Sequence, residues 1–342
     1  MDTITHGIAG AVIAKAGFSK RLGKTGTVAG VISAILPDAD IIFRFFGDEA
    51  FLKYHRGLGN SLFFMIPLAL FIALIFNRFS KKKAFGLFFL LAILGIMSHN
   101  FLDLQTSFGT MLLYPFSDRR FSLDLVFIID LYYTGLFIAG LIIAYLWKKR
   151  GEAISILTLL TIILYTGLCA YNHSKAISLA KDFASNQKLN AINISSLPQP
   201  LSPFLWANYI DTEKEIYQGF VDLKNKNPET IKPDTYIGRF KSKFRSPKNV
   251  EYKFWVKFPD SPFADMALKL EGLKFFLWFA RFPVLIEEKD DGDLHILRFF
   301  DLQFSAMEGR YPFLYEVVFN RQGNVISQKF INGSFLRFKG KS

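Results

Sequence analysis

The chain has 342 residues, of which 51% are hydrophobic, 16% aromatic and 20% charged, and its mean hydropathy is +0.25. A charged fraction below the usual quarter, with positive mean hydropathy, excludes a disordered chain and an ordinary soluble domain. The net charge of +12 suggests a nucleic acid or a membrane surface as partner, and the single cysteine, Cys169, excludes a disulfide framework and a cysteine-based zinc finger.

Long apolar stretches are confined to the first half of the chain. Four of them run for about 20 residues with almost no charge, which is enough to cross ~30 Å of hydrocarbon: residues 57–79, 84–104, 124–147 and 153–171. Two earlier stretches, 4–18 and 25–36, are rich in Gly and Ala, and the second stops at Pro37. We expect these two to be short, tilted or re-entrant. The sequence therefore predicts an α-helical multi-pass membrane bundle of about six segments, without a signal peptide.

The second half has a different composition. Residues 185–205 collect Ser, Asn and Pro, which is typical of a linker or surface loop. Beyond them, short alternating runs such as EIYQGFVDL and YPFLYEVVF are separated by the turn signals DDGD and NRQGN, and residues 264–279 have helical spacing of Leu and Phe. We predict a helical membrane domain at 1–172, a linker or surface segment at 173–205, and a β-rich α+β extracytoplasmic domain at 206–342.

Basic residues cluster after every second predicted crossing. The clusters are Lys20, Arg21 and Lys24; Arg78, Lys81, Lys82 and Lys83; and Lys148, Lys149 and Arg150. Short loops rich in Lys and Arg stay on the cytoplasmic side of bacterial membranes. We therefore expect the N-terminus, residues 37–60 and 101–124, and everything after Tyr171 to be extracytoplasmic.

The charge of the second half does not predict nucleic-acid binding. Residues 173–342 hold 25 Lys+Arg and 19 Asp+Glu, a net of +6, with both signs interleaved. Because no basic stripe is formed, we expect anionic lipid headgroups rather than a nucleic acid as partner.

The histidines and carboxylates of the first half fall at the outer ends of their segments. They are His6; Asp38 and Asp40 in PDAD; His55 beside Arg56; His99 and Asp103 in H-x3-D; and Asp124 and Asp130. Ionisable groups near membrane depth are costly and indicate a functional site. In H-x3-D the two side chains share one helix face and are able to bind one ion together. Imidazole with carboxylate suits Zn²⁺, Mn²⁺ or Fe, so we predict a centre of one to three divalent ions, most simply Zn²⁺.

Each polar group alone also has a structural interpretation. His6 suits an interfacial histidine, PDAD suits a helix stop with capping carboxylates, and His55 with Arg56 suits interfacial anchoring. The metal hypothesis rests on their joint occurrence on one side of the membrane.

The runs THG, PDAD, HRG and SHNFLDLQTSFGTMLLYPFSDRRFSLDLVFIID resemble the membrane-bound metal-dependent hydrolases of the YdjM/YbcI group, a bacterial inner-membrane family, over about residues 1–170. That family is related to the zinc-dependent phospholipase C and P1 nuclease superfamily. The resemblance implies phosphoester hydrolysis and a ligand set of His6, Asp38, Asp40, His55, His99 and Asp103. Many relatives read H-R-G-x-x-H-S, whereas this chain has Asn60 in the second His place, and an amide is a poorer transition-metal ligand.

We therefore expect a membrane-bound hydrolase that cleaves a phosphoester of a lipid or lipid-linked substrate, in the manner of a phospholipase C. Asp40 or Asp38 is the expected general base, and Arg56 the expected phosphate ligand. Asn60, Asp124 and Asp130 are expected as further ligands or as groups that orient a ligand. Two alternatives stay open: a transporter or ion-binding membrane protein, and a non-enzymatic scaffold or sensor with a structural metal.

Overall fold

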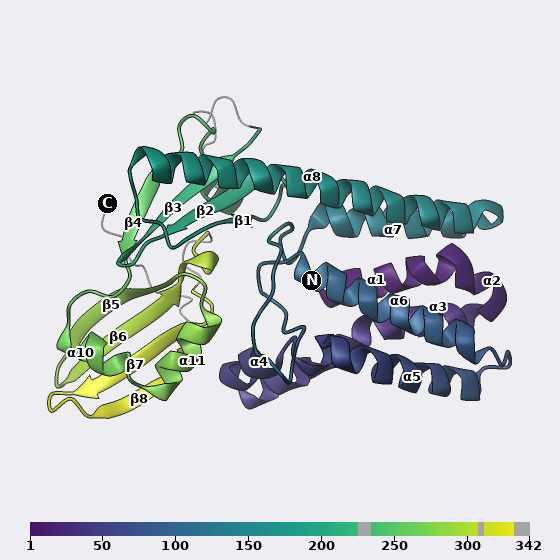
Figure 1. Ribbon diagram of the computed structural model, residues 1–342, viewed down its shortest axis with the longest axis horizontal. Coiled ribbons are helices and arrows are strands. Elements are labelled where there is room, and N and C mark those ends of the chain that lie inside the picture. The colour runs from purple at the N-terminus through teal and green to yellow at the C-terminus, as the bar shows by residue number, and fades with distance from the viewer. Residues whose placement is uncertain (225–233, 307–310, 332–342) are drawn as a thin grey trace. The chain divides into compact units, whose positions relative to one another are not determined.

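The computed structural model describes residues 1–224, 234–306 and 311–331 (Figure 1). The chain divides into two compact units. Unit 1 comprises residues 1–171 and 200–203, and unit 2 comprises residues 172–199 and 204 onward. The predicted boundary between residues 172 and 173 lies next to this division, and the predicted domain 206–342 extends into segments outside the described residues.

Unit 1 is mainly helical, apart from a long loop between residues 105 and 130. Its elements in chain order are α1 (Thr3–Ile13), a π-helical turn (Ala14–Phe18), α2 (Ser19–Leu22), α3 (Lys24–Ile35), the 3₁₀ segment η2 (Leu36–Phe46), α4 (Asp48–Tyr54), the 3₁₀ turn η3 (Leu58–Asn60), α5 (Leu62–Phe79), α6 (Phe85–Leu104), α7 (Leu131–Leu146), a 3₁₀ turn (Lys148–Arg150), and α8 (Gly151–Asn186), which continues into unit 2.

Among the described residues, four helical stretches are long and apolar enough to cross a membrane: Lys24–Phe46, Leu62–Phe79, Phe85–Leu104 and Lys148–Asn186. They contain or overlap the predicted segments 25–36, 57–79, 84–104 and 153–171. The predicted segment 124–147 forms a shorter apolar helix, Leu131–Leu146, because residues 125 and 126 are held in a loop by hydrogen bonds to the Gln105 carbonyl. The count of six segments stays a prediction.

Glycines set how closely the helices of unit 1 approach. A Cβ on Gly10 of α1 would lie 2.2 Å from the carbonyl oxygen of Gly30 on α3, and a Cβ on Gly95 of α6 would lie 2.6 Å from the Cβ of Ser33. Such distances are accessible only to residues without a side chain. Helix α3 is therefore packed closely between α1 and α6.

The basic loops meet at one end of unit 1. The Lys82 ammonium donates to the Arg21 carbonyl over 2.7 Å, and Lys20 forms an ion pair with Glu152 at the start of α8. The three predicted cationic clusters thus lie near one another although they are far apart in sequence.

Unit 2 contains two four-stranded antiparallel sheets (Figure 1). The first has the order β1 (Asn193–Pro198), β2 (Leu205–Asp211), β3 (Glu215–Asp222) and β4 (Tyr252–Val256). The second has the order β5 (Pro283–Asp291), β6 (Leu294–Asp301), β7 (Leu314–Asn320) and β8 (Val325–Ile331). The described residues of unit 2 also form the short α-helices α9 (Tyr236–Lys241), α10 (Pro262–Ala267) and α11 (Glu271–Phe279), the 3₁₀ turn Leu302–Phe304, and the end of α8.

Several details of unit 2 differ from the sequence expectations. The interval 173–205, predicted as a linker, contains the end of α8 and the strand β1, because Ala176, Ala180 and Ala184 bury one face of the helix against the first sheet. The single helix predicted over 264–279 is two helices, α10 and α11. Strand β2 has a continuous buried run rather than an alternating one, and its sequence therefore gave no period-two signal.

One hydrophobic cluster joins the two sheets of unit 2. Tyr209 of β2 stacks on Phe282 with a ring separation of 4.1 Å, and its hydroxyl donates to the Leu302 carbonyl. Leu197, Ile216, Val284, Phe300 and Leu314 belong to the same buried cluster. Both sheets consequently share one core.

A histidine lies between two carboxylates on the second sheet. The Nδ1 of His295 is 2.7 Å from Asp290 Oδ1, its Nε2 is 2.9 Å from Glu288 Oε1, and its ring stacks on Phe263. Partial burial lowers the pKa of His295, but hydrogen bonds and charge from Asp290 and Glu288 outweigh it, so the pKa lies above the usual 6.5.

We expect Gly10→Ala to destabilise unit 1 by about 3 kcal/mol, because the new methyl group overlaps the Gly30 backbone. The matched control is Gly135→Ala in α7, where a Cβ meets nothing within 4 Å and the change improves helix propensity. Thermal denaturation in detergent measures both. Equal midpoints for the two variants would contradict the close α1–α3 contact.

The raised pKa of His295 predicts a pH-dependent contribution to stability. The contribution is fully present below the unfolded pKa of about 6.5 and is lost as the pH rises through the folded pKa. The difference in unfolding midpoint between wild type and His295→Asn should therefore be largest near about pH 6 and should shrink at higher pH. Asp290→Asn, which removes one of the two partners, should show a smaller difference of the same sign. A difference that grows with pH would refute the assignment.

Candidate metal centre

The first contributor to the site is α1, whose start is fixed by its own sequence. Asp2 precedes the helix and accepts a hydrogen bond from the Thr5 amide over 3.0 Å, so the helix begins at Thr3. His6 follows one turn later and is completely buried. Its Nε2 lies 3.2 Å from Asp103 Oδ1, whereas its Nδ1 is buried and makes no hydrogen bond with a described residue.

The second contributor is the H-x3-D pair of α6. His99 and Asp103 are one turn apart and both are fully buried. The Nδ1 of His99 lies 2.7 Å from the carbonyl oxygen of Ala34 on α3. Because a carbonyl oxygen only accepts, Nδ1 carries a proton, which leaves Nε2 as the nitrogen that is able to bind a metal ion. The two rings of His6 and His99 stack with centroids 3.9 Å apart.

The third contributor is η2, which follows Pro37. Asp38 is buried, and its Oδ1 lies 3.5 Å from His99 Nε2. Donor atoms of His6, Asp38 and His99 lie within 4.8 Å of one another, which is close enough for one metal ion to bind all three. His99 Nε2 also lies 3.2 Å from Asp103 Oδ2 without making a hydrogen bond with a described residue. A nitrogen lone pair facing two carboxylates requires a cation between them, either a proton or a metal ion.

A second group shares Asp38. Donor atoms of Asp38, Asp40 and His55 also lie within 4.8 Å of one another. His55 Nδ1 is 2.7 Å from Asp40 Oδ1, and the other oxygen of Asp40 accepts from the Arg56 amide over 2.9 Å. His55 and Asp40 are slightly exposed, with side-chain exposures of 13% and 10%, whereas the first group is buried. The second group therefore forms the more accessible part of the site.

A close backbone contact brings the PDAD segment (residues 37–40) and the HRGLGN loop (residues 55–60) together. A Cβ on Gly59 would lie 2.3 Å from the Pro37 carbonyl oxygen, so only glycine allows the HRGLGN loop to lie against PDAD. The amide of Met111 donates to the Arg56 carbonyl, which ties the same loop to the segment after α6.

Asp103 has a different environment from the other five predicted ligands. It belongs to neither group, but its side chain contacts both imidazoles of the first group. Arg56 Nη2 lies 3.0 Å from Asp103 Oδ1, and Asn60 Nδ2 donates to Oδ2 over 2.8 Å; the amino group of Met1 also contacts Oδ1. In this arrangement Asp103 positions His6 and His99.

Arg56 is buried and forms an ion pair with Asp103. Its side-chain exposure is 1%, and its Nη1 also donates to Thr106 Oγ1 over 2.8 Å. A phosphate contact by this guanidinium requires exchange of the Asp103 partner. The role of Arg56 as a phosphate ligand stays a prediction. In the structure its guanidinium neutralises the buried carboxylate of Asp103.

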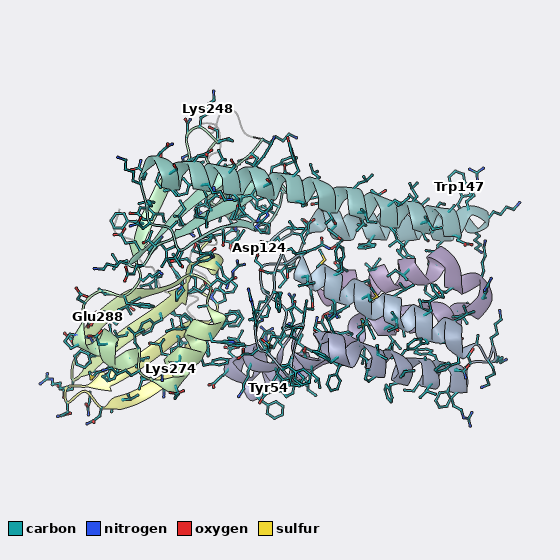
Figure 2. All side chains as sticks on the ribbon, in the orientation of Figure 1. Tyr54, Asp124, Trp147, Lys248, Lys274 and Glu288 are labelled. Carbon is teal, nitrogen blue, oxygen red and sulfur yellow. The ribbon has the colours of Figure 1, made fainter. Side chains whose placement is uncertain are left out.

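The structure brings Asn60 into the site but gives Asp130 a helix-capping role. Asn60 is fully buried, and its Oδ1 makes no hydrogen bond with a described residue. Asp130 caps α7 by accepting from the Tyr133 amide, and Tyr165 of α8 donates to it. Asp124 lies in the segment between α6 and α7 with a φ of 55° (Figure 2). Neither aspartate belongs to the two His/carboxylate groups.

Three groups that contact the site residues were not predicted from the sequence: Thr3, the Ala34 carbonyl and Thr106. Thr3 donates to Asp38 Oδ2 over 3.2 Å, and the Ala34 carbonyl fixes the tautomer of His99. A backbone oxygen has no sequence signature, so the Ala34 contact was not predictable. Thr106 had a weak signal, because it lies three residues after Asp103, close to one helical turn away.

The buried donor set fits a transition-metal ion. Each imidazole of the first group is held through one nitrogen, His99 by Ala34 and His6 by Asp103, and its other nitrogen is buried without a hydrogen bond to a described residue. This is the arrangement in which a second partner orients a metal-ligating histidine. Two imidazoles and a carboxylate suit Zn²⁺, Mn²⁺ or Fe.

Comparison with known proteins identifies the family. Residues 1–176 match the family described as YdjM inner membrane protein. The chain is 22% identical over 324 residues to the uncharacterized protein YfhP of Bacillus subtilis (strain 168), with 92% of this chain and 90% of that protein covered. It is 34% identical over 96 residues to the inner membrane protein YbcI of Escherichia coli (strain K12), with 27% of this chain and 55% of that protein covered. No solved structure matches. The chain belongs to the YdjM family, as its sequence motifs predicted, and is a bacterial inner membrane protein.

We expect His99→Ala to lose most of the bound metal, because it removes a buried ligand and its Ala34 contact. Elemental analysis of detergent-purified protein, after loading with Zn²⁺ and dialysis, measures this. Asp103→Asn should weaken Zn²⁺ binding by about 10- to 100-fold, because the imidazoles of His6 and His99 lose the carboxylate that orients them. The matched control is Asp130→Asn, which alters a buried helix cap outside both groups. Loss of metal in Asp130→Asn but not in His99→Ala would refute the assignment of this metal site.

Proposed function

We propose that this member of the YdjM family is a membrane-bound metal-dependent hydrolase that cleaves a phosphoester of a lipid or lipid-linked substrate. The observation that carries the proposal is the pair of His/carboxylate groups sharing Asp38, of which one is buried and the other partly exposed. A buried group suits firm metal binding, and an adjoining exposed group gives substrate and water access. This combination favours catalysis over a purely structural metal site.

A divalent ion bound here would lower the pKa of a coordinated water and polarise a phosphoryl oxygen. The residues of the chain supply the rest. Asp40 is the proposed proton acceptor, because it is partly exposed and is held by His55 and by the Arg56 amide. Asp103 and Ala34 fix the orientation of the two buried imidazoles, so little reorganisation is needed during the reaction.

Apolar side chains beside the site support a lipid substrate. Asp38 and Asp40 are followed along η2 by exposed Ile42, Phe45 and Phe46, the last two with exposures of 90% and 74%. An exposed apolar surface adjoining a polar site is what a molecule with an acyl chain and a phosphorylated headgroup would contact.

We further propose that the site faces the extracytoplasmic side. The basic clusters meet around Arg21, Lys82 and Glu152, on the segments that join α1 to α3, α5 to α6 and α7 to α8. The site uses the start of α1 and the end of α6, which are the opposite ends of those helices. Because basic loops favour the cytoplasm, the site would lie outside.

The test is hydrolysis of a total bacterial lipid extract by metal-loaded protein, with released headgroups and phosphate followed by mass spectrometry. We expect turnover by wild type, none by His99→Ala, and a loss of about 100-fold or more in Asp40→Asn. His295→Asn, outside both groups, is the matched control and should retain activity.

The same experiment separates the alternatives. Wild-type protein that binds metal but releases no product from any lipid class would favour a scaffold or sensor with a structural metal. Metal-dependent uptake of an ion or solute into proteoliposomes, without hydrolysis, would favour a transporter.

A further inference from the structure

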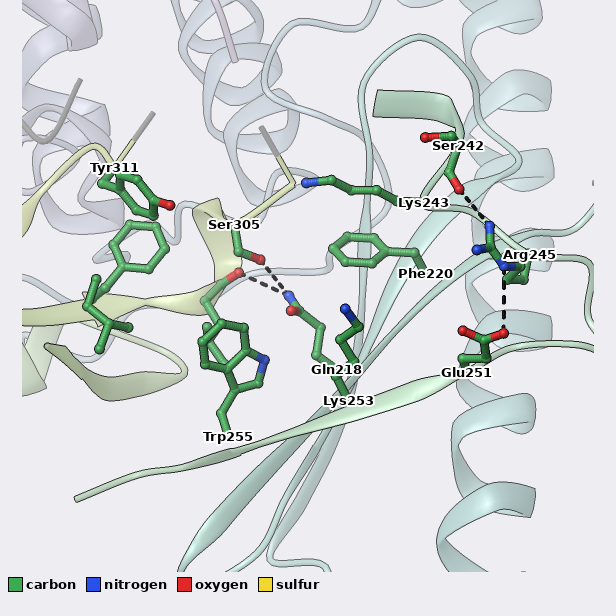
Figure 3. Close-up of a pocket in the computed structure, with 13 residues that line it drawn as sticks. Gln218, Phe220, Ser242, Lys243, Arg245, Glu251, Lys253, Trp255, Ser305 and Tyr311 are labelled. Carbon is green, nitrogen blue, oxygen red and sulfur yellow. Dashed lines mark hydrogen bonds and ion pairs between the residues drawn. The ribbon is translucent and has the colours of Figure 1, made fainter. Parts of the chain in front are cut away.

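Unit 2 contains a cavity of about 400 Å³ that is lined by both of its sheets (Figure 3). Residues of β3 and β4 form one wall, and residues of β5 and β6 with the turn after β6 form the other. The volume lies at the small end of the range of about 300 to 1,000 Å³ for ligand pockets. The cavity is therefore large enough for a small molecule.

The wall that contains β3, β4 and residues 242–251 between them is cationic. Gln218 lies opposite Lys253 in the strand register, and Trp255, two residues farther along β4, shares the same face. Lys243, Arg245 and Lys253 bring three positive charges to the lining, against one carboxylate, Glu251, which lies 4.0 Å from Arg245 and is 76% exposed. The described residues of the lining thus carry a net charge of +2 and favour an anion.

Two donors in this wall have no protein acceptor within the described ranges. The indole nitrogen Nε1 of Trp255 is buried and makes no hydrogen bond there, and Lys253 forms no ion pair there. In Figure 3 the indole nitrogen faces the side of the cavity where Gln218 and Lys253 lie. A buried N–H without an acceptor is costly, so an acceptor supplied by a ligand would stabilise the site.

Four apolar side chains of the lining are continuous with the core of unit 2. Phe220, Ile286, Phe300 and Leu302 line the cavity and belong to, or pack against, the cluster that joins the two sheets. Gln218 is held by Ser305 over 2.6 Å and by Tyr209, which keeps the polar wall in place (Figure 3). The cavity accordingly pairs a cationic face with an apolar one.

We propose that this cavity binds a small anionic amphiphile: a molecule with one phosphate, phosphonate or carboxylate head and a short apolar chain. The head accepts from Trp255 Nε1 and pairs with Lys253, and the chain lies against Phe220 and Phe300. A free inorganic anion would leave the apolar side chains uncovered, and a neutral amphiphile would leave the positive charge of Lys253 without a counter-charge. This ligand site is independent of the proposed hydrolase activity of unit 1.

The test uses full-length protein in nanodiscs of zwitterionic lipid and measures binding by isothermal titration calorimetry. Octylphosphonate is the probe, because its C–P bond is not a substrate for phosphoester hydrolysis. Octyl glucoside supplies the same chain without charge, and inorganic phosphate supplies the charge without the chain. We expect octylphosphonate to bind at least about tenfold more tightly than either, and its binding to weaken with added salt.

Variants assign the binding to this cavity. Lys253→Met and Trp255→Phe should each weaken octylphosphonate binding about tenfold, whereas Lys289→Met, an equivalent charge removal on β5 outside the cavity lining, should not. Lys253 is exposed, so its substitution leaves the fold intact, as the unfolding midpoint verifies. His99→Ala should bind octylphosphonate as wild type does. Equal binding of all three probes, unchanged affinity in both cavity variants, or loss of binding in His99→Ala would overturn the proposal.

Discussion

The carboxylate of Asp103 imposes the central constraint on unit 1. It is fully buried on an apolar helix, where an unpaired charge costs several kcal/mol, so the surrounding elements have to supply donors. The side chains of Arg56 and Asn60 and the buried imidazoles of His6 and His99 meet that requirement. Because these groups come from α1, α6 and the HRGLGN loop, satisfying one charge brings together three segments distant in sequence. The histidines that bind Asp103 are thereby aligned with Asp38, and the candidate metal centre follows from the same contacts.

Close backbone approach makes that convergence possible. Gly10 against Gly30, Gly95 against Ser33 and Gly59 against Pro37 are contacts in which a side chain would overlap its neighbour. They place α1, α3, α6 and η2 near enough for side chains as short as those of Asp and His to meet. The small residues of the first two segments, which made those segments look weak as membrane helices, are the residues that allow tight packing.

Much of the site was predictable because its signals were local. The H-x3-D spacing on an apolar helix and the isolated THG, PDAD and HRG motifs named the residues that make up the two His/carboxylate groups. What the sequence did not reveal was which carboxylate pairs with Arg56, because that choice depends on tertiary contacts. In the fold, charge-free runs and alternating strands were recognisable. Strand β2 and the structured interval after α8 were not, because residues buried on both faces show no alternation, and a polar segment reads as a loop until its partner is known.

The side-chain partners of Asp103 have an order along the chain. Met1, His6, Arg56, Asn60 and His99 all precede it. A nascent chain is made from its N-terminus, so these donors are already synthesised when α6 leaves the ribosome. A bundle inserted in the order of its synthesis would therefore bring Asp103 into place after the groups that neutralise it, so that its buried carboxylate would not have to wait for a partner.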